Sequence, residues 1–139
     1  MTQTVKDVMT TDPLTASPGT TVADAARLMK KHDVGAIVVE EDGEVRGIVT
    51  DRDIVVRAVA EQKPPDSTRV ADVVSGDVHT VSPDEPLERA IEQMRRRSVR
   101  RLPVVEGGKA VGILSLGDLA IERDESSALA DISAAPSNS

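Results

Sequence analysis

The chain has 139 residues, a formal net charge of −7 and no cysteine, phenylalanine, tyrosine or tryptophan. This length is enough for one compact domain, or for two halves that are each too small to be stable alone. The absence of cysteine excludes disulfides, thiolate-ligated metals and thiol catalysis, and the absence of aromatic side chains excludes base stacking on single-stranded nucleic acid. The acidic balance disfavours nucleic acids and anionic membranes as partners. No apolar run is long enough for a signal peptide or a membrane span, so we expect a cytoplasmic protein.

The first half of the chain predicts a small unit of strands and helices. A short extended piece at residues 14–16 comes first. A helix over about residues 21–31 follows, because apolar residues recur there at helical spacing: Val22, Ala25, Ala26 and Met29. Two apolar strands then flank the hairpin signal Asp42-Gly43, and a second helix runs from Asp51 to about Glu61.

The second half of the chain repeats the first. Residues 5–55 align with residues 70–120 at a constant shift of 65 positions, and roughly 16 of about 51 positions are identical. The repeat predicts an α+β fold of two β-α-β-β-α units that pack through their sheets about a pseudo-twofold axis. We expect four segments along the chain: a first repeat at 5–61, a linker at 62–69, a second repeat at 70–124 and a disordered tail at 125–139.

Both return strands end in one pattern, which is a glycine, two apolar residues, a hydroxyl, two variable residues and a carboxylate. It occupies residues 47–53 and 112–118. A hydroxyl beside the free N–H groups of a helix start can meet a phosphate, and a carboxylate three residues later can accept the hydroxyls of a ribose. The same spacing also describes an ordinary helix start, with the hydroxyl as N-cap and the carboxylate as its partner. The residues alone leave both interpretations open.

No catalytic or metal-binding set is visible. His32 and His79 lack metal-ligand partners at helical or hairpin spacing, and no motif places a nucleophile beside a base. We therefore expect no enzyme activity, no metal and no cofactor.

The combined motifs resemble those of CBS domains, and the pair resembles a Bateman module. The resemblance rests on four strings: Val8-Met9-Thr10, Asp42-Gly43, Gly47-Ile-Val-Thr-Asp-Arg-Asp-Ile54 and Arg101-Leu-Pro-Val-Val105. It covers the chain from about Val5 to Arg123. The resemblance is to small stand-alone CBS-pair proteins, so we expect no attached catalytic or transport domain. The resemblance implies a regulatory module that binds AMP, ADP, ATP or S-adenosylmethionine in clefts between the repeats. It also implies a homodimer and an unidentified regulated protein. The alternative is a dimeric structural or adaptor protein whose clefts are vestigial.

The resemblance also assigns ligand-binding residues. By their place in the motif, Asp53 and Asp118 would accept the ribose hydroxyls, and Thr50 and Ser115 would contact ribose or phosphate. The adenine would lie against backbone and aliphatic side chains, namely Thr15, Ala16, Ala36 and Ile37 in one site and Thr80, Val81, Leu102 and Pro103 in the other.

The arginines make the two expected sites unequal. Arg100 and Arg101 stand where the resemblance implies phosphate contacts, whereas the first repeat has Gly35 and Ala36 there. Arg52 either contacts a phosphate or pairs with a nearby carboxylate. The run at residues 95–97 is either solvated or meets a charged partner. The sequence therefore predicts a duplicated fold with two different sites.

Overall fold

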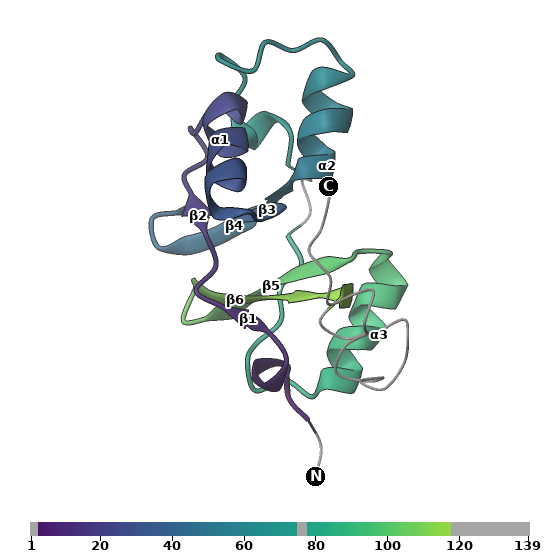
Figure 1. Ribbon diagram of the computed structural model, residues 1–139. Coiled ribbons are helices and arrows are strands. Elements are labelled where there is room, and N and C mark those ends of the chain that lie inside the picture. The colour runs from purple at the N-terminus through teal and green to yellow at the C-terminus, as the bar shows by residue number, and fades with distance from the viewer. Residues whose placement is uncertain (1–2, 75–77, 118–139) are drawn as a thin grey trace. The chain divides into compact units, whose positions relative to one another are not determined.

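The computed structural model describes residues 3–74 and 78–117, which form two compact units (Figure 1). The described part of unit A consists of residues 13–74, 78–79 and 108–110. The described part of unit B consists of residues 3–12, 80–107 and 111–117. The predicted tail at 125–139 and the motif carboxylate Asp118 lie outside the described residues.

Unit A contains a three-stranded sheet with the strand order β2-β3-β4. Strand β2 pairs in parallel with β3, and β3 pairs antiparallel with β4. The elements of unit A are β2 (Thr15–Ala16), α1 (Val22–His32), β3 (Ala36–Glu41), β4 (Glu44–Thr50), α2 (Asp51–Ile54), the π-helix η2 (Val55–Val59) and the 3₁₀ turn η3 (Val70–Asp72).

Unit B has a sheet with the order β1-β6-β5, in which β1 pairs antiparallel with β6. Its elements are the 3₁₀ turn η1 (Val5–Asp7), β1 (Thr10–Thr11), α3 (Leu87–Arg97), β5 (Arg101–Glu106) and β6 (Lys109–Ser115). The bounds of η1, α1, β3 and β4, shifted by 65, give those of η3, α3, β5 and β6. The predicted α+β class is confirmed. Of the predicted last helix, Leu116 and Gly117 are described and are helical.

Each unit contains the opening segment of the other repeat. The N–H of Val70 donates to the carbonyl of Thr20 (2.8 Å), and the N–H of Val5 donates to the carbonyl of Glu85 (3.0 Å). Both valines are fully buried, Val70 in the core of unit A and Val5 in that of unit B. The compact units are therefore built from different segments than the sequence repeats.

The helix and turn signals act locally, largely as the sequence indicates. The hydroxyl of Thr21 accepts the N–H of Asp24 at the start of α1. Both hairpins turn through two consecutive residues with positive φ, as a type I′ turn requires. Ala26, expected on the apolar face of α1, is exposed, whereas the other three apolar residues of that face are buried. Pro86 precedes α3 as its N-cap, and the helix begins at Leu87.

The second helix of the first repeat changes its winding. Four α-helical residues are followed by a π-helix at Val55–Val59, in which the N–H of Ala60 donates to the carbonyl of Val55 (2.9 Å). The expected linker also has tertiary contacts, because the N–H of Val22 donates to the carbonyl of Thr68 (2.8 Å). No helix in the described ranges is both long and apolar enough to cross a membrane.

Candidate functional site

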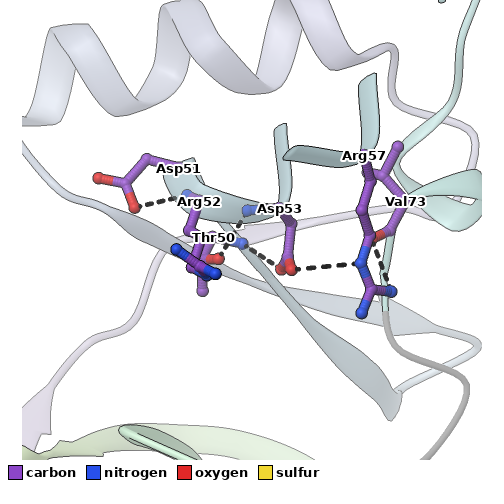
Figure 2. A network of polar contacts seen from close by, with 6 residues as sticks. All are labelled: Thr50, Asp51, Arg52, Asp53, Arg57 and Val73. Carbon is purple, nitrogen blue, oxygen red and sulfur yellow. Dashed lines mark hydrogen bonds and ion pairs between the residues drawn. The ribbon is translucent and has the colours of Figure 1, made fainter. Parts of the chain in front are cut away.

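In unit A, Thr50 and Asp53 fix each other at the junction of β4 and α2 (Figure 2). The N–H of Thr50 donates to Oδ2 of Asp53 (2.9 Å), and the N–H of Asp53 donates to Oγ1 of Thr50 (3.1 Å). This reciprocal pair is a capping box, which satisfies two backbone donors at the helix start. The structural interpretation of the motif is therefore correct for this copy.

The capping box leaves part of both side chains available. Asp53 uses Oδ2 for the cap, and its Oδ1 lies 4.0 Å from Nε of Arg57. The carboxylate keeps 20% of its side-chain surface exposed. Thr50 accepts one hydrogen bond and still carries its own hydroxyl proton. A cap and a ligand contact can thus share these two residues.

Arg57 is the member of this cluster that the sequence reasoning missed. Its Nη1 lies 3.5 Å from the carbonyl oxygen of Val73, so the guanidinium spans from Asp53 to the end of η3 (Figure 2). Its spacing of four residues from Asp53 on a helix is a signal that could have identified it.

The sheet of unit A places the expected adenine-contacting residues on two faces. Ile37 and the partly buried Ala16 belong to the core beside α1. Because side chains alternate along a strand, Thr15 and Ala36 point to the opposite face. Ala36 pairs with Thr50 across β3 and β4, so these two side chains share that face. The structure therefore places Thr15, Ala36 and Thr50 on one face of the sheet, while Ile37 could offer a ligand only its backbone.

Arg52 is exposed and makes no ion pair with another residue in the described ranges. Its backbone N–H donates to Oδ1 of Asp51 (2.8 Å). Of its two expected roles, pairing with a nearby carboxylate is not observed here.

Unit B has the same framework with different side chains. The N–H of Leu116 donates to the carbonyl of Arg100 (2.9 Å), which matches the bond from Asp51 to Gly35 (3.0 Å) in unit A. The backbone of Arg100 therefore lies beside Leu116, which directly follows the motif hydroxyl of Ser115. The remaining expected residues divide as in unit A: Leu102 and Val81 are in the core, Pro103 is buried outside that cluster, Arg101 is half-buried and Thr80 is exposed.

A shallow, open hollow of about 440 Å³ adjoins the edge of the sheet in unit B. Two expected site residues, Thr80 and Val81, are among the residues that line it, together with Glu85 before α3 and Arg89 in its first turn. Arg100, Arg101 and Ser115 are not among these lining residues.

The basic run on α3 is exposed to solvent. Arg95 and Arg96 both approach Glu92, at 3.4 and 3.8 Å, with their side chains 74% exposed. These contacts with Glu92, together with the helix dipole, stabilise Arg95 and Arg96 at the end of α3 without requiring a second macromolecule. Within the described ranges, no three His, Cys, Asp or Glu side chains are grouped so that they could hold a metal ion.

Comparison with known proteins gives consistent matches. The CBS domain family model matches twice, at residues 5–59 and 70–124. The CBS domain-containing protein YhcV of Bacillus subtilis is 45% identical over 119 residues, which cover 86% of this chain and 84% of that protein. The CBS-domain pair of protein MJ0100, solved in complex with 5′-methylthioadenosine and S-adenosylmethionine, is 26% identical with a TM-score of 0.78. The match covers 87% of this chain and 99% of that one. A hexameric CBS-CP12 protein from bloom-forming cyanobacteria is 30% identical with a TM-score of 0.82, and the match covers 89% of this chain and 70% of that one.

Proposed function

The chain belongs to the CBS-domain family as a tandem pair, and on this premise we propose that it is a regulatory module that binds adenosine-containing ligands. The ligand class comprises AMP, ADP, ATP and S-adenosylmethionine. The ribose hydroxyls would donate to the motif carboxylate at the end of the return strand in each repeat. Binding would shift a conformational equilibrium of the module and so act on a regulated protein.

One observation carries the proposal for unit A. Asp53 is held in place by its cap through Oδ2, while Oδ1 keeps its acceptor capacity beside a guanidinium. A pre-oriented, charged acceptor suits a vicinal diol, because hydrogen bonds to an ionised group are stronger than those between neutral groups. The adenosyl ligands bound by MJ0100 support the same ligand class.

The charges around the two motifs support different ligands. Near the motif of unit A, Asp51 and Asp53 balance Arg52 and Arg57 in formal charge. Near that of unit B, Arg100 and Arg101 add positive charge that the first repeat lacks. We therefore propose that unit B prefers phosphorylated nucleotides, whereas unit A takes less anionic ligands such as S-adenosylmethionine.

The test is a binding titration with a matched pair of variants. The chain has no tryptophan or tyrosine, so adenine released from purified protein can be read directly by its ultraviolet absorbance. Asp53→Asn keeps an oxygen acceptor for the cap but removes the charge, and should weaken binding of S-adenosylmethionine in unit A by roughly 1–3 kcal/mol. Asp24→Asn removes the carboxylate three residues after the N-cap of α1, which pairs with Arg27 rather than with the cap, and should leave affinity unchanged. A wild-type protein that binds none of the four ligands in calorimetry would contradict the proposed function.

We further propose that two copies associate through the second helix of the first repeat. Val55, Val56 and Val59 are exposed there by 58%, 43% and 63%. Exposed apolar side chains clustered on one helix indicate an interaction surface. The hexameric CBS-CP12 protein supports self-association within similar chains. Val59→Glu should lower the mass measured by light scattering, whereas Val34→Glu, at an exposed valine after α1, should not.

A further inference from the structure

Arg57 connects the motif carboxylate of unit A to the opening segment of the second repeat. Its Nε lies 4.0 Å from Oδ1 of Asp53, and its Nη1 lies 3.5 Å from the carbonyl oxygen of Val73 (Figure 2). Val73 is fully buried and follows η3 as its C-cap, and its N–H donates to the carbonyl of Val70 (3.0 Å). The guanidinium therefore touches one residue from each sequence repeat inside one compact unit.

Both contacts of Arg57 are long. Hydrogen bonds between a guanidinium and a carboxylate usually measure about 2.7–2.9 Å between heavy atoms. The Arg57 side chain is also half exposed, at 49%. The guanidinium is thus shared by two acceptors and held closely by neither. A change at one acceptor can move it toward the other.

Resting on the proposed function, we propose that Arg57 is a positioning residue that couples ligand binding at Asp53 to the docking of residues 68–74. Beside Asp53 it orients Oδ1 for the ribose. When ribose hydroxyls donate to that carboxylate, the guanidinium shifts toward the carbonyl of Val73, and the hydrogen bond that shortens there strengthens the packing of η3 and favours the ligand-bound state. By linkage, tighter docking of η3 must in turn favour the ligand.

An i,i+4 ion pair at a helix surface can also be purely structural, and such pairs contribute little to stability. The two roles differ in what they affect. A structural pair changes the melting temperature slightly and leaves ligand affinity alone. A positioning residue changes affinity and also the response of residues 68–74 to the ligand. Arg46, which is 50% exposed and lies 3.6 Å from Glu41 and 3.8 Å from Glu44 in the hairpin of β3 and β4, provides the matched control for a structural pair in the same unit.

The experiment combines calorimetry with amide hydrogen exchange, using S-adenosylmethionine and AMP as probes. In the wild-type protein, the probe bound in unit A should slow exchange in residues 50–57 and in residues 68–74. Arg57→Ala should weaken that binding about tenfold and abolish the protection of 68–74. Arg57→Lys keeps the charge but lacks the planar fork that reaches two acceptors, so it should recover affinity more than coupling. Arg46→Ala should behave as wild type.

The outcomes separate this inference from the proposed function. A wild-type protein that binds neither probe overturns both. Wild-type binding that Asp53→Asn weakens but Arg57→Ala does not overturns this inference alone. Lower affinity in Arg57→Ala with unchanged protection of 68–74 overturns the coupling. Should Arg57→Ala fail to fold, Arg57→Lys tests the coupling, because it keeps the aliphatic stem and the charge but should lose the protection of residues 68–74. Full protection of 68–74 in Arg57→Lys overturns the inference.

Discussion

Val70 donates its backbone N–H to the carbonyl of Thr20, and the same bond shifted by 65 residues joins Val5 to Glu85. Each bond ties the opening segment of one repeat to the helix start of the other. The repeats therefore exchange their opening segments reciprocally. A repeat cut from the chain would lose part of its core, because Val70 completes the core of unit A and Val5 that of unit B.

The exchanged valines should be important for stability. Val70→Ala and Val5→Ala each delete buried carbon atoms and leave a cavity, so each should lower the free energy of unfolding by about 2 kcal/mol. Urea denaturation followed by far-ultraviolet circular dichroism measures this change. Val34→Ala, at a site that is 39% exposed and outside the proposed association surface, should have little effect. Equal stability of all three variants would show that the exchanged segments do not contribute to the folded core.

The two strand glycines of the repeated motif should differ in tolerance. A Cβ on Gly112 would lie 2.9 Å from the carbonyl oxygen of Thr10 and 2.6 Å from Sδ of Met9. The methionine can move, but Thr10 is fixed by its pairing in β1. Gly112→Ala should therefore destabilise the protein by roughly 1–3 kcal/mol. On Gly47 the nearest atom is 3.9 Å away, so Gly47→Ala should be tolerated in the same denaturation assay.

Features governed by neighbouring residues could be predicted from the sequence. The hairpin turns, the cap formed by Thr21 and the apolar faces of α1 and α3 depend on residues within four positions of each other. The constant shift of 65 residues then places η3, α3, β5 and β6 in the second copy. The motif at Thr50 and Asp53 also predicts the capping box that the structure shows, while the ligand contact of these residues stays a prediction.

Features that depend on distant pairing could not be predicted. The hydrogen bond between Val5 and Glu85 joins residues that are far apart in sequence. It is a bond between backbone atoms, so the side chains of these two residues give no signal of it. From the repeat alone, each compact unit should coincide with one copy. An alignment at a constant shift cannot detect that the two copies exchange equivalent segments. The reach of Arg57 to Val73 was hidden for the same reason, because Val73 offers only a backbone carbonyl.

The carboxyl group of Asp7 makes the stability of unit B depend on pH. Hydrogen bonds from the backbone and side chain of Thr4 lower the pKa of Asp7 below its ordinary value of 3.8. A carboxyl whose folded pKa is depressed stabilises the fold above its unfolded pKa and loses that effect as pH falls through the folded pKa. The stability gap between wild type and Asp7→Asn should therefore shrink below pH 3.8. Urea midpoints measured for both proteins across this range provide the test, and a gap independent of pH would contradict it.

The two threonine caps can separate stability from binding. Thr21 caps α1 and Thr50 caps α2 through the same acceptor geometry, at 3.1 Å in both. Thr21→Ala and Thr50→Ala should each lower the free energy of unfolding by about 1 kcal/mol. Only Thr50→Ala should also lower the affinity for S-adenosylmethionine measured by calorimetry, because the hydroxyl of Thr50 lies in the proposed site. Thr50→Ser should restore both properties. Equal affinity in the two alanine variants would leave Thr50 with the role of a cap alone.

The unequal charge of the two copies predicts ligand-specific effects. Arg100→Ala removes a positive charge next to Leu116, at the end of the second return strand. It should weaken the binding of ATP by roughly 1–3 kcal/mol and the binding of S-adenosylmethionine far less. The effect should diminish at high ionic strength, since salt screens an exposed charge. Arg96→Ala is the matched control, because that arginine is exposed on α3 and already lies near Glu92. Calorimetry at two salt concentrations decides the matter. Equal losses for ATP in Arg100→Ala and Arg96→Ala would mean that the whole basic run acts as a diffuse field, and that Arg100 makes no specific phosphate contact.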